Sequence, residues 1–383
     1  MTCSEGDSGS SKPYRVLSLD GGGIRGLYTA LLLKGLSNRF AANQRLAATA
    51  SYDLGAQFDL VVGTSTGAIL ATALAAGVPL ERVIELYRQK ARTIFTDPAG
   101  EGVRAGWWAV RHLRRAANDP SPLEDALSAV LGEETVAQMY ARRGIALCVP
   151  SVNVETNKSW VFKTPHDKRT NRLNRDNDYR LVDVCMASTA APMVLPLRGI
   201  ASPGDKEGAV NWFTDGGLWA NNPSLVAMTE ALSMSEPGQP IELMSVSTCP
   251  PFKGCTITEA GANRGTIGWQ AGVGIVQVAL DAQSYAYDYV TRTVAQHTGR
   301  DVGYVRLIDA DVPAADAVHL ALDNPSPNAL DLLSRLARDA VDLNMSAATA
   351  GSPPPQPLIA KFFANIKPFP AQPTEGAEIG QRA

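Results

Sequence analysis

The sequence predicts an α/β protein of three layers, with a mainly parallel central sheet and helices on both of its faces. Residues 14–19 form a β-prone run that is followed by glycines and then by residues 27–36, whose apolar side chains recur at helical spacing. Residues 58–62 are a second apolar run, followed by another glycine-containing turn and the Ala/Leu-rich residues 68–76. Repeated strand-turn-helix units require crossover connections, which place the strands in parallel and the helices on the sheet faces.

The later elements continue this pattern. We expect, in chain order, helices at 80–95 and 122–131, a hairpin of strands at 145–155 and 159–163, a helix at 181–188, strands at 210–214 and 241–246, a long helix at 272–295, a strand at 304–308, and helices at 330–343 and 358–366.

We expect one catalytic domain and two tails. The catalytic domain is predicted over residues 14–366, of which 250–366 is the part with the weakest pattern and a candidate for a regulatory role. Residues 1–13 are polar and Ser/Gly-rich, and residues 367–383 are Pro-rich, so both are predicted to be tails.

Composition narrows the class of protein. The 383 residues carry a formal net charge of -3, which gives no basis for nucleic-acid binding. The five cysteines are odd in number and lack the spacing of a zinc or redox motif, so we expect no metal and a reducing compartment. The N-terminus lacks a secretory signal, and the longest apolar stretch, 67–78, is too short to span a bilayer. These features predict a cytoplasmic protein.

A serine between two glycines follows the second strand. Gly63 and Gly67 flank Ser65 in the pattern G-x-S-x-G, with an apolar run before it and a helical run after it. This context is typical of a nucleophile elbow, in which a strained turn lifts the serine Oγ above the sheet. The helix that starts there also presents backbone N–H groups to a developing oxyanion. Ser65 is therefore the predicted nucleophile.

The first glycine-rich turn has two interpretations. Gly21, Gly22, Gly23 and Gly26 satisfy the dinucleotide-binding pattern G-x-G-x-x-G after a strand. That pattern expects an acidic residue about 20 positions later to bind a ribose, but residues 39–50 contain no carboxylate. A glycine loop beside a serine elbow is better suited to donating backbone N–H groups to an acyl-transfer oxyanion, with Arg25 adding a positive charge.

An aspartate at the end of a later strand is the predicted base. Asp215 follows the apolar residues 210–214 and is followed by Gly216 and Gly217. A carboxylate presented at a strand end with small residues behind it could close on Ser65 in a site poor in water.

A histidine base is the alternative to Asp215. In the order Ser, Asp, His, the candidates are His297 and His319, and neither follows a convincing strand. His112 lies in an Arg-rich segment and His166 in a polar loop, so both are predicted to be solvated surface residues.

With these residues assembled, the sequence resembles the patatin-like phospholipases. DGGGIRG at 20–26, GTSTG at 63–67 and DGG at 215–217 match the family's anion-hole loop, serine elbow and aspartate motif in the family's order. The resemblance implies a Ser65/Asp215 dyad and an oxyanion hole lined by Gly22, Gly23 and Arg25. It also implies hydrolysis of membrane-lipid esters through an acyl-serine intermediate, with no cofactor required.

Other functional classes stay open at this point. They are a dinucleotide-binding oxidoreductase, a general esterase without phospholipid preference, and a catalytically inactive lipid-binding protein. The chain is also similar to patatin phospholipase effectors of bacterial anti-phage systems that are activated by cyclic dinucleotides, which implies such a nucleotide as an activator. Membrane phospholipids at the inner face of the membrane are the implied partner, and a homo-oligomer is one of the states left open.

One segment has the composition of a membrane-contacting surface. Residues 104–115 combine two tryptophans, Trp107 and Trp108, with arginines that include Arg111, Arg114 and Arg115. Aromatic rings beside guanidinium groups suit an interface with anionic headgroups. A helix with a buried tryptophan and a solvated basic face would have the same composition.

Overall fold

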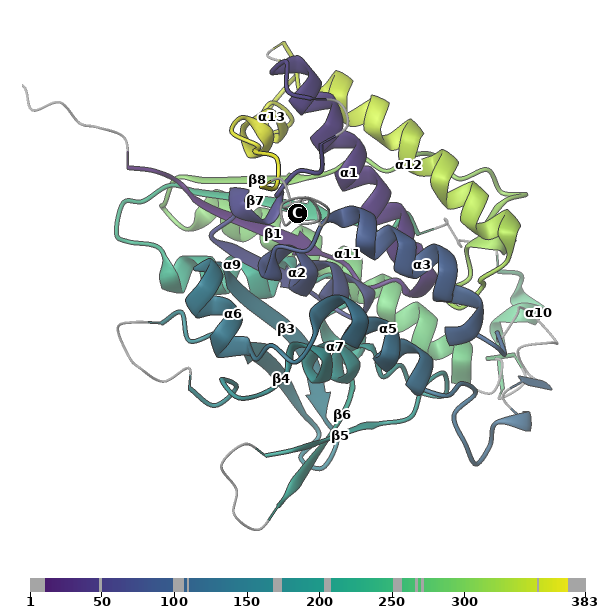
Figure 1. Cartoon of the computed structure of the whole chain (residues 1–383). Helices are drawn as coiled ribbons and strands as arrows, with labels where there is room; N and C mark the ends of the chain where they lie inside the picture. The colour runs from purple at the N-terminus through teal and green to yellow at the C-terminus, as the bar shows by residue number, and fades with distance from the viewer. Residues whose placement is uncertain are drawn as a thin grey trace, which may run out of the picture.

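A computed structural model describes residues 11–47, 50–98, 107–108, 110–167, 174–202, 208–250, 257–265, 268–269, 272–349 and 351–370. An eight-stranded sheet runs through the middle of the molecule, in the order β5-β6-β3-β2-β1-β7-β8, with β4 beside β3 (Figure 1). The strands are β1 (Tyr14–Leu19), β2 (Leu60–Gly63), β3 (Ala146–Asn153), β4 (Lys158–Lys163), β5 (Arg198–Ala201), β6 (Val210–Asp215), β7 (Ile241–Val246) and β8 (Val302–Arg306).

The centre of the sheet is parallel and one side of it is antiparallel. β1 pairs in parallel with β2 and β7, β2 pairs in parallel with β3, and β7 with β8. β4 and β6 run antiparallel to β3, and β5 antiparallel to β6. The predicted α/β fold class and the predicted hairpin of β3 and β4 are therefore confirmed.

Helices cover both faces of this sheet, as Figure 1 shows. The α-helices are α1 (Gly26–Asn43), α2 (Thr66–Ala76), α3 (Leu80–Ile94), α5 (Ser121–Leu131), α6 (Val136–Arg143), α7 (Leu181–Thr189), α8 (Gly217–Ala220), α9 (Ser224–Met234), α10 (Glu259–Ala262), α11 (Val273–His297), α12 (Pro327–Ala347) and α13 (Leu358–Phe363). Short 3-10 helices are η1 (Gly23–Arg25), η2 (Gly55–Gln57) and η4 (Ala317–Leu320).

Alternation along the strands divides the core into two layers. On β3, Leu147 and Val149 join the larger apolar cluster under α1, α2, α3 and α7, whereas Ala146 and Cys148 join the smaller cluster that includes Ala227 of α9. This period of two is what a strand buried on both faces requires. The side chains of one strand therefore belong to two different environments.

The chain after residue 250 is packed into the same body. β8 extends the sheet beyond β7, and α12 and α13 pack against α1 (Figure 1). The rings of Phe40 in α1 and Phe363 in α13 stack with centroids 4.9 Å apart. The predicted boundaries of a regulatory part and of the two tails remain predictions.

Within the predicted C-terminal tail, Phe369 donates its amide to the carbonyl of Ser51, at 2.8 Å. Most of residues 1–13 and of residues 367–383 lie outside the described parts of the chain. Among the helices that the structure describes, none combines the length and the apolar character needed to cross a membrane.

Candidate active site

Ser65 occupies a strained turn between β2 and α2. Its backbone has φ 55° and ψ -123°, a positive φ that side chains rarely adopt. A Cβ at Gly63 would lie 2.1 Å from the Gly67 carbonyl oxygen, and a Cβ at Gly67 would lie 2.3 Å from that of Leu19. Both flanking glycines are therefore required by backbone packing, as the elbow motif predicts.

Asp215 is in direct contact with Ser65. The Ser65 hydroxyl donates to Asp215 Oδ2 over 2.8 Å, and the other carboxylate oxygen accepts the amide of Gly217 at 2.6 Å. Because β6 runs antiparallel to β3, its last residue lies opposite Ser151. On the same edge of β3, β2 pairs with residues 146–148, so the two strands point their C-terminal ends toward each other. The sheet topology thus brings together two residues that are far apart in the sequence.

The Asp215 carboxylate has an unusual electrostatic environment. It forms no ion pair with any described residue, and burial raises its pKa to about 6, while the Gly217 amide and the Ser65 hydroxyl oppose the rise. A carboxylate with a pKa nearer to neutral is a better proton acceptor than an ordinary aspartate. Above that pKa, Asp215 is ionised and able to take the Ser65 proton.

Ser188 is a supporting residue that sequence reasoning did not identify. Its hydroxyl accepts the Ser65 amide at 2.9 Å and donates to the carbonyl oxygen of Pro150 at 2.6 Å. A Cβ at Gly216 would lie 2.2 Å from that same carbonyl oxygen, so Gly216 is also required here. Ser188 therefore fixes the elbow to β3. Ser188 lies outside the three sequence motifs, so none of them indicated its role.

The first glycine loop lies against the elbow. A Cβ at Gly21 would be 3.3 Å from Ser65 Cβ, and one at Gly26 would be 2.4 Å from the Tyr87 hydroxyl oxygen. The Gly21 amide donates to the Asn221 carbonyl at 2.8 Å, and the Gly22 amide donates to Thr66 Oγ1 at 3.2 Å. The loop therefore borders the serine, where an oxyanion loop must lie.

Gly23 presents the most available amide of this loop. Its N–H has no hydrogen-bond acceptor within the described part of the chain, although Gly23 lines the cavity that contains Ser65. Its φ is +57°, and a Cβ would lie 2.0 Å from the Leu322 carbonyl oxygen. The free donor and the lack of space for a side chain both fit the role predicted for Gly23.

Arg25 places a buried cation beside the loop. It is 4% exposed, it lines the same cavity, and its Nε has no hydrogen-bond partner. Burial lowers its pKa, while the charges of Asp281 and Asp309 act in the opposite direction. In the described residues Arg25 forms no ion pair, so its charge is available to an anionic ligand.

A cavity of about 1060 Å³ opens onto Ser65 and Asp215, and both charged and apolar residues line it. The charged residues include Asp20, Arg25, Asp281, Asp288, Arg306 and Asp309. The apolar residues include Ile69, Leu86, Ile94, Phe95, Trp108, Leu123, Met193, Val194 and Leu195. A large cavity with a mainly apolar wall and a few polar groups suits a ligand that carries both polar and apolar parts.

The histidines lie away from the dyad. None of the four lines the cavity, and His297 Nδ1 bonds instead to the Thr293 carbonyl on its own helix. The prediction that His112 and His166 are solvated was wrong. His112 is held by Asp97, and His166 is 9% exposed and bonds to Glu230 through Nε2. The side chain that accepts the Ser65 hydroxyl is Asp215.

The two tryptophans of the predicted membrane segment differ. Trp107 is 73% exposed, whereas Trp108 is 6% exposed, lines the cavity and donates its indole N–H to the Asp97 carbonyl. Trp108 is therefore corrected from a membrane contact to a wall of the cavity. Arg111 is exposed but paired with Asp97, and Arg114 and Arg115 are exposed.

Comparison with known proteins identifies a family and several relatives of this chain. Residues 17–228 match the family model of the patatin-like phospholipases. A relative from Vibrio cholerae named cGAMP-activated phospholipase is 29% identical over 85% of this chain and 89% of its own length. Relatives of the same name from Escherichia coli and Pseudomonas aeruginosa are 28% and 29% identical, over 94% and 84% of this chain and 96% and 85% of their own lengths.

The matched region contains every residue of the three motifs, and it covers more than half of the chain. The chain therefore belongs to the patatin-like phospholipase family.

Proposed function

We propose that this protein hydrolyses the fatty-acyl esters of membrane phospholipids, with Ser65 as nucleophile and Asp215 as general base. The observation that carries the proposal is the 2.8 Å hydrogen bond from Ser65 Oγ to Asp215 Oδ2 at the wall of a large, partly apolar cavity. A serine on a strained elbow, a base without a competing cation and a neighbouring free amide are the parts that acyl transfer requires.

The proposed reaction has two halves. Ser65 Oγ attacks the ester carbonyl carbon while its proton passes to Asp215 Oδ2, and the free amide of Gly23 with the Arg25 cation stabilises the oxyanion. The Gly22 amide, which was predicted to line the oxyanion hole, donates to Thr66 Oγ1 instead. When the ester bond breaks, the departing alcohol takes the proton from Asp215 and leaves an acyl group on Ser65. Water then attacks this ester in the same way, and fatty acid is released. The mechanism takes its proton acceptor and its charges from the protein's own groups.

The rim of the cavity supports contact with a lipid surface. Leu218, Val278 and Tyr285 line the cavity and are 42%, 56% and 72% exposed, and Trp107 adjoins the cavity wall at Trp108. Exposed apolar side chains around an opening mark interaction sites. We propose that this rim, together with Arg114 and Arg115, meets the membrane, and that the protein acts from the cytoplasm at the inner face.

Control by a cyclic dinucleotide follows from the relatives. The bacterial relatives from Vibrio cholerae, Escherichia coli and Pseudomonas aeruginosa, each named cGAMP-activated phospholipase, align with more than four fifths of this chain, which includes residues beyond the family model. We propose that cGAMP activates this protein as well, as an effector of anti-phage defence.

The test is fatty-acid release from mixed phospholipid vesicles by the wild type, Ser65→Ala and Ser346→Ala, with and without cGAMP. We expect cGAMP-dependent release by the wild type and by Ser346→Ala, whose side chain is exposed on α12. Ser65→Ala should lose activity by at least about 10⁴-fold, which is the scale for loss of a catalytic serine. Release by Ser65→Ala at the wild-type rate would disprove the assignment.

Two further measurements test the proposed substrate and the proposed activator independently. A short soluble ester hydrolysed faster than vesicle lipid, even with cGAMP, would favour a general esterase. The rate of vesicle hydrolysis is also measured with cGAMP, with a second cyclic dinucleotide and without either. If neither nucleotide changes the rate, the protein is a phospholipase that cyclic dinucleotides do not activate.

A further inference from the structure

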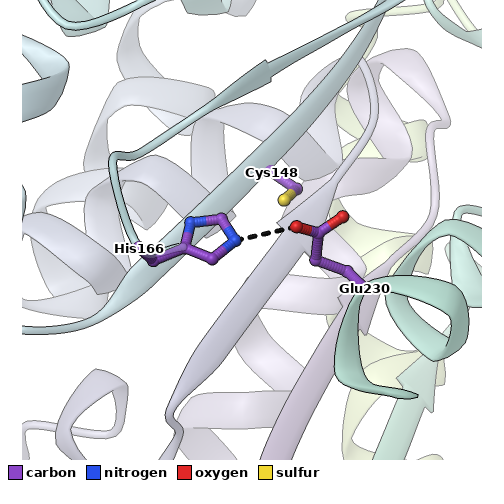
Figure 2. A group of neighbouring side chains, drawn as sticks. All are labelled: Cys148, His166 and Glu230. Carbon is purple, nitrogen blue, oxygen red and sulfur yellow. Dashed lines mark hydrogen bonds and ion pairs between the residues drawn. The ribbon is translucent and has the colours of Figure 1, made fainter. Parts of the chain in front are cut away.

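A second buried cluster of reactive side chains lies away from Ser65, and no step of the proposed reaction uses it. Figure 2 shows its members, Cys148, His166 and Glu230, which come from β3, the segment after β4 and α9. All three are buried, at 0%, 9% and 7% exposure, and their ligand atoms lie within 4.8 Å of one another. A thiol, an imidazole and a carboxylate form a donor set that zinc binds.

Strand alternation places Cys148 in this cluster. Cys148 points to the face of the sheet covered by α9, because it shares the smaller apolar cluster with Ala227 and Ala231. The other buried cysteines of the described chain, Cys185 and Cys249, contact backbone carbonyl oxygens through their thiols. Cys148 has no such acceptor within the described residues, and it faces an imidazole and a carboxylate instead.

His166 is already oriented as a ligand would be. Its Nδ1 lies 2.7 Å from Thr164 Oγ1, and its Nε2 lies 2.9 Å from Glu230 Oε1. Thr164 Oγ1 also accepts the Leu147 amide at 2.9 Å, which fixes that hydroxyl on β3. A hydrogen bond from the second ring nitrogen is the usual means of orienting a metal-binding histidine. Nε2 is thus left facing the carboxylate.

Glu230 has a separate partner for each oxygen. Oε1 faces His166, whereas Oε2 is paired with the ammonium of Lys163. Lys163 is the direct cross-strand neighbour of Cys148, so its side chain lies on the same face of the sheet. An ion bound to Oε1 would leave the Lys163 contact at Oε2 in place.

We propose that Cys148 Sγ, His166 Nε2 and Glu230 Oε1 bind one Zn²⁺ ion, with Thr164 and Lys163 supporting the ligands. On binding, the thiol loses its proton and the ion takes the position between Nε2 and Oε1. The thiolate and the carboxylate offset the two charges of the ion, and the Lys163 ammonium at Oε2 leaves the cluster with one net positive charge. Zinc bond lengths of about 2.0–2.3 Å bring such ligand atoms to roughly 3.5 Å from one another, so small side-chain rotations complete the site.

We assign this ion a structural role, with three ligands from the protein and its fourth position left to water. Both ring nitrogens of His166 are occupied by Thr164 and Glu230, so neither is directed to activate the Cys148 thiol as a nucleophile. The ion would join β3, the segment after β4 and α9, which are distant in the sequence. Because α9 starts shortly after Asp215, this link also steadies the segment that carries the base.

The test compares tag-free wild type with Cys148→Ser, His166→Gln and the matched control Cys185→Ser, whose thiol is equally buried. After removal of metal by chelator, each protein is titrated with Zn²⁺ and Co²⁺, and zinc content, Co²⁺ absorption and melting temperature are measured. We expect one zinc per chain, a raised melting temperature and sulfur-to-cobalt charge-transfer absorption for the wild type and for Cys185→Ser.

Cys148→Ser should lose the charge-transfer band and bind zinc more weakly by more than the roughly 10- to 100-fold that loss of a supporting residue costs. His166→Gln should show the same weakening. If either variant fails to fold, the chelator-treated wild type still decides the matter. Wild type that takes up no zinc and melts at the same temperature with and without it would show that the cluster is a hydrogen-bonded ion-pair network only.

Discussion

Two buried polar clusters adjoin β3, and they differ in how their charges are balanced. At the active site, Asp215 has no cation partner and Arg25 no anion partner among the described residues. The second cluster adjoins β3 at Cys148, and there Glu230 of α9 is paired with both His166 and Lys163. Unpaired buried charge lowers stability. In the proposed reaction the Ser65 proton neutralises Asp215 and the oxyanion pairs with Arg25, so both unpaired charges around Ser65 gain a partner as the reaction proceeds.

The strongest test of this comparison is Asp215→Asn. Without the general base, we expect hydrolysis of vesicle lipid to fall by at least about 10³-fold, within the range for loss of acid-base catalysis. In the wild type, the rate should rise with pH until Asp215 is ionised, with its midpoint at the raised pKa of about 6. Initial rates from pH 5 to 8 measure both effects. A wild-type rate that does not change across this range would argue against Asp215 as the base.

The same variant should be more stable than the wild type. The Asp215 pKa is raised from 3.8 to about 6, so the folded state holds a proton that the unfolded state releases between these values. Stability from this group is therefore complete below about pH 4 and falls by about 3 kcal/mol as pH rises through about 6. Asp215→Asn avoids this loss, so its advantage in urea unfolding should be present at pH 8 and absent at pH 4.

Asp183→Asn is the matched control with the opposite sign. Burial disfavours the Asp183 charge, but hydrogen bonds from Arg180 and Arg198 outweigh it and lower the pKa of Asp183. Its ionised form therefore stabilises the fold above its ordinary pKa, and Asp183→Asn should be less stable than the wild type at pH 8. Two buried aspartates that respond alike would contradict the distinction between paired and unpaired charge.

The paired cluster is tested by Glu230→Gln in chelator-treated protein. Removal of this carboxylate leaves the Lys163 ammonium without its partner, so the free energy of unfolding should fall by about 3 kcal/mol. The rate of lipid hydrolysis per folded molecule should stay at the wild-type value. Glu81→Gln, which breaks the half-exposed pair with Lys34, should cost less than about 1 kcal/mol.

Local signals in the sequence were sufficient to predict the turns that carry Ser65, Asp215 and the first glycine loop. Each motif lies on a strand-to-turn junction, and the turn at Ser65 and the clash at Gly63 are properties of a few consecutive residues. The helix α6 was missed, although the sequence contains its signal. Thr135 and Gln138 form a capping box, with Thr135 as N-cap of that helix.

Contacts between distant segments could not be predicted in the same way. His166 lies in a polar stretch of sequence, and only the pairing of β3 with β4 and the packing of α9 bury it beside Glu230. Trp107 and Trp108 are adjacent and chemically identical, so composition cannot tell which ring is buried. Ser188 acts through tertiary hydrogen bonds to the elbow, which no spacing in the sequence reveals.

Gly23→Ala tests whether the first glycine loop contributes to the site around Ser65. An alanine at φ +57°, with its Cβ 2.0 Å from the Leu322 carbonyl oxygen, must displace the loop and its free amide. Loss of one oxyanion donor costs about 10²- to 10³-fold in rate, so we expect a loss of about 10²-fold. Gly144→Ala has a similar φ of +67° and open space around it, and should destabilise the fold without changing the rate. Equal rates for both variants would show that Gly23 is not an oxyanion donor.

The smallest expected effect separates the two neighbouring tryptophans. Trp107 is 73% exposed and Trp108 is 6% exposed. Trp107→Ala should reduce vesicle hydrolysis about fivefold, which corresponds to about 1 kcal/mol of partial ring burial in lipid, and should leave hydrolysis of a soluble short-chain ester unchanged. Trp108→Ala removes part of the cavity wall and the hydrogen bond to the Asp97 carbonyl, so the hydrolysis rates of both substrates and the melting temperature should fall. If Trp107→Ala slows both substrates equally, the exposed ring acts on the cavity and the membrane contact must lie elsewhere on the rim.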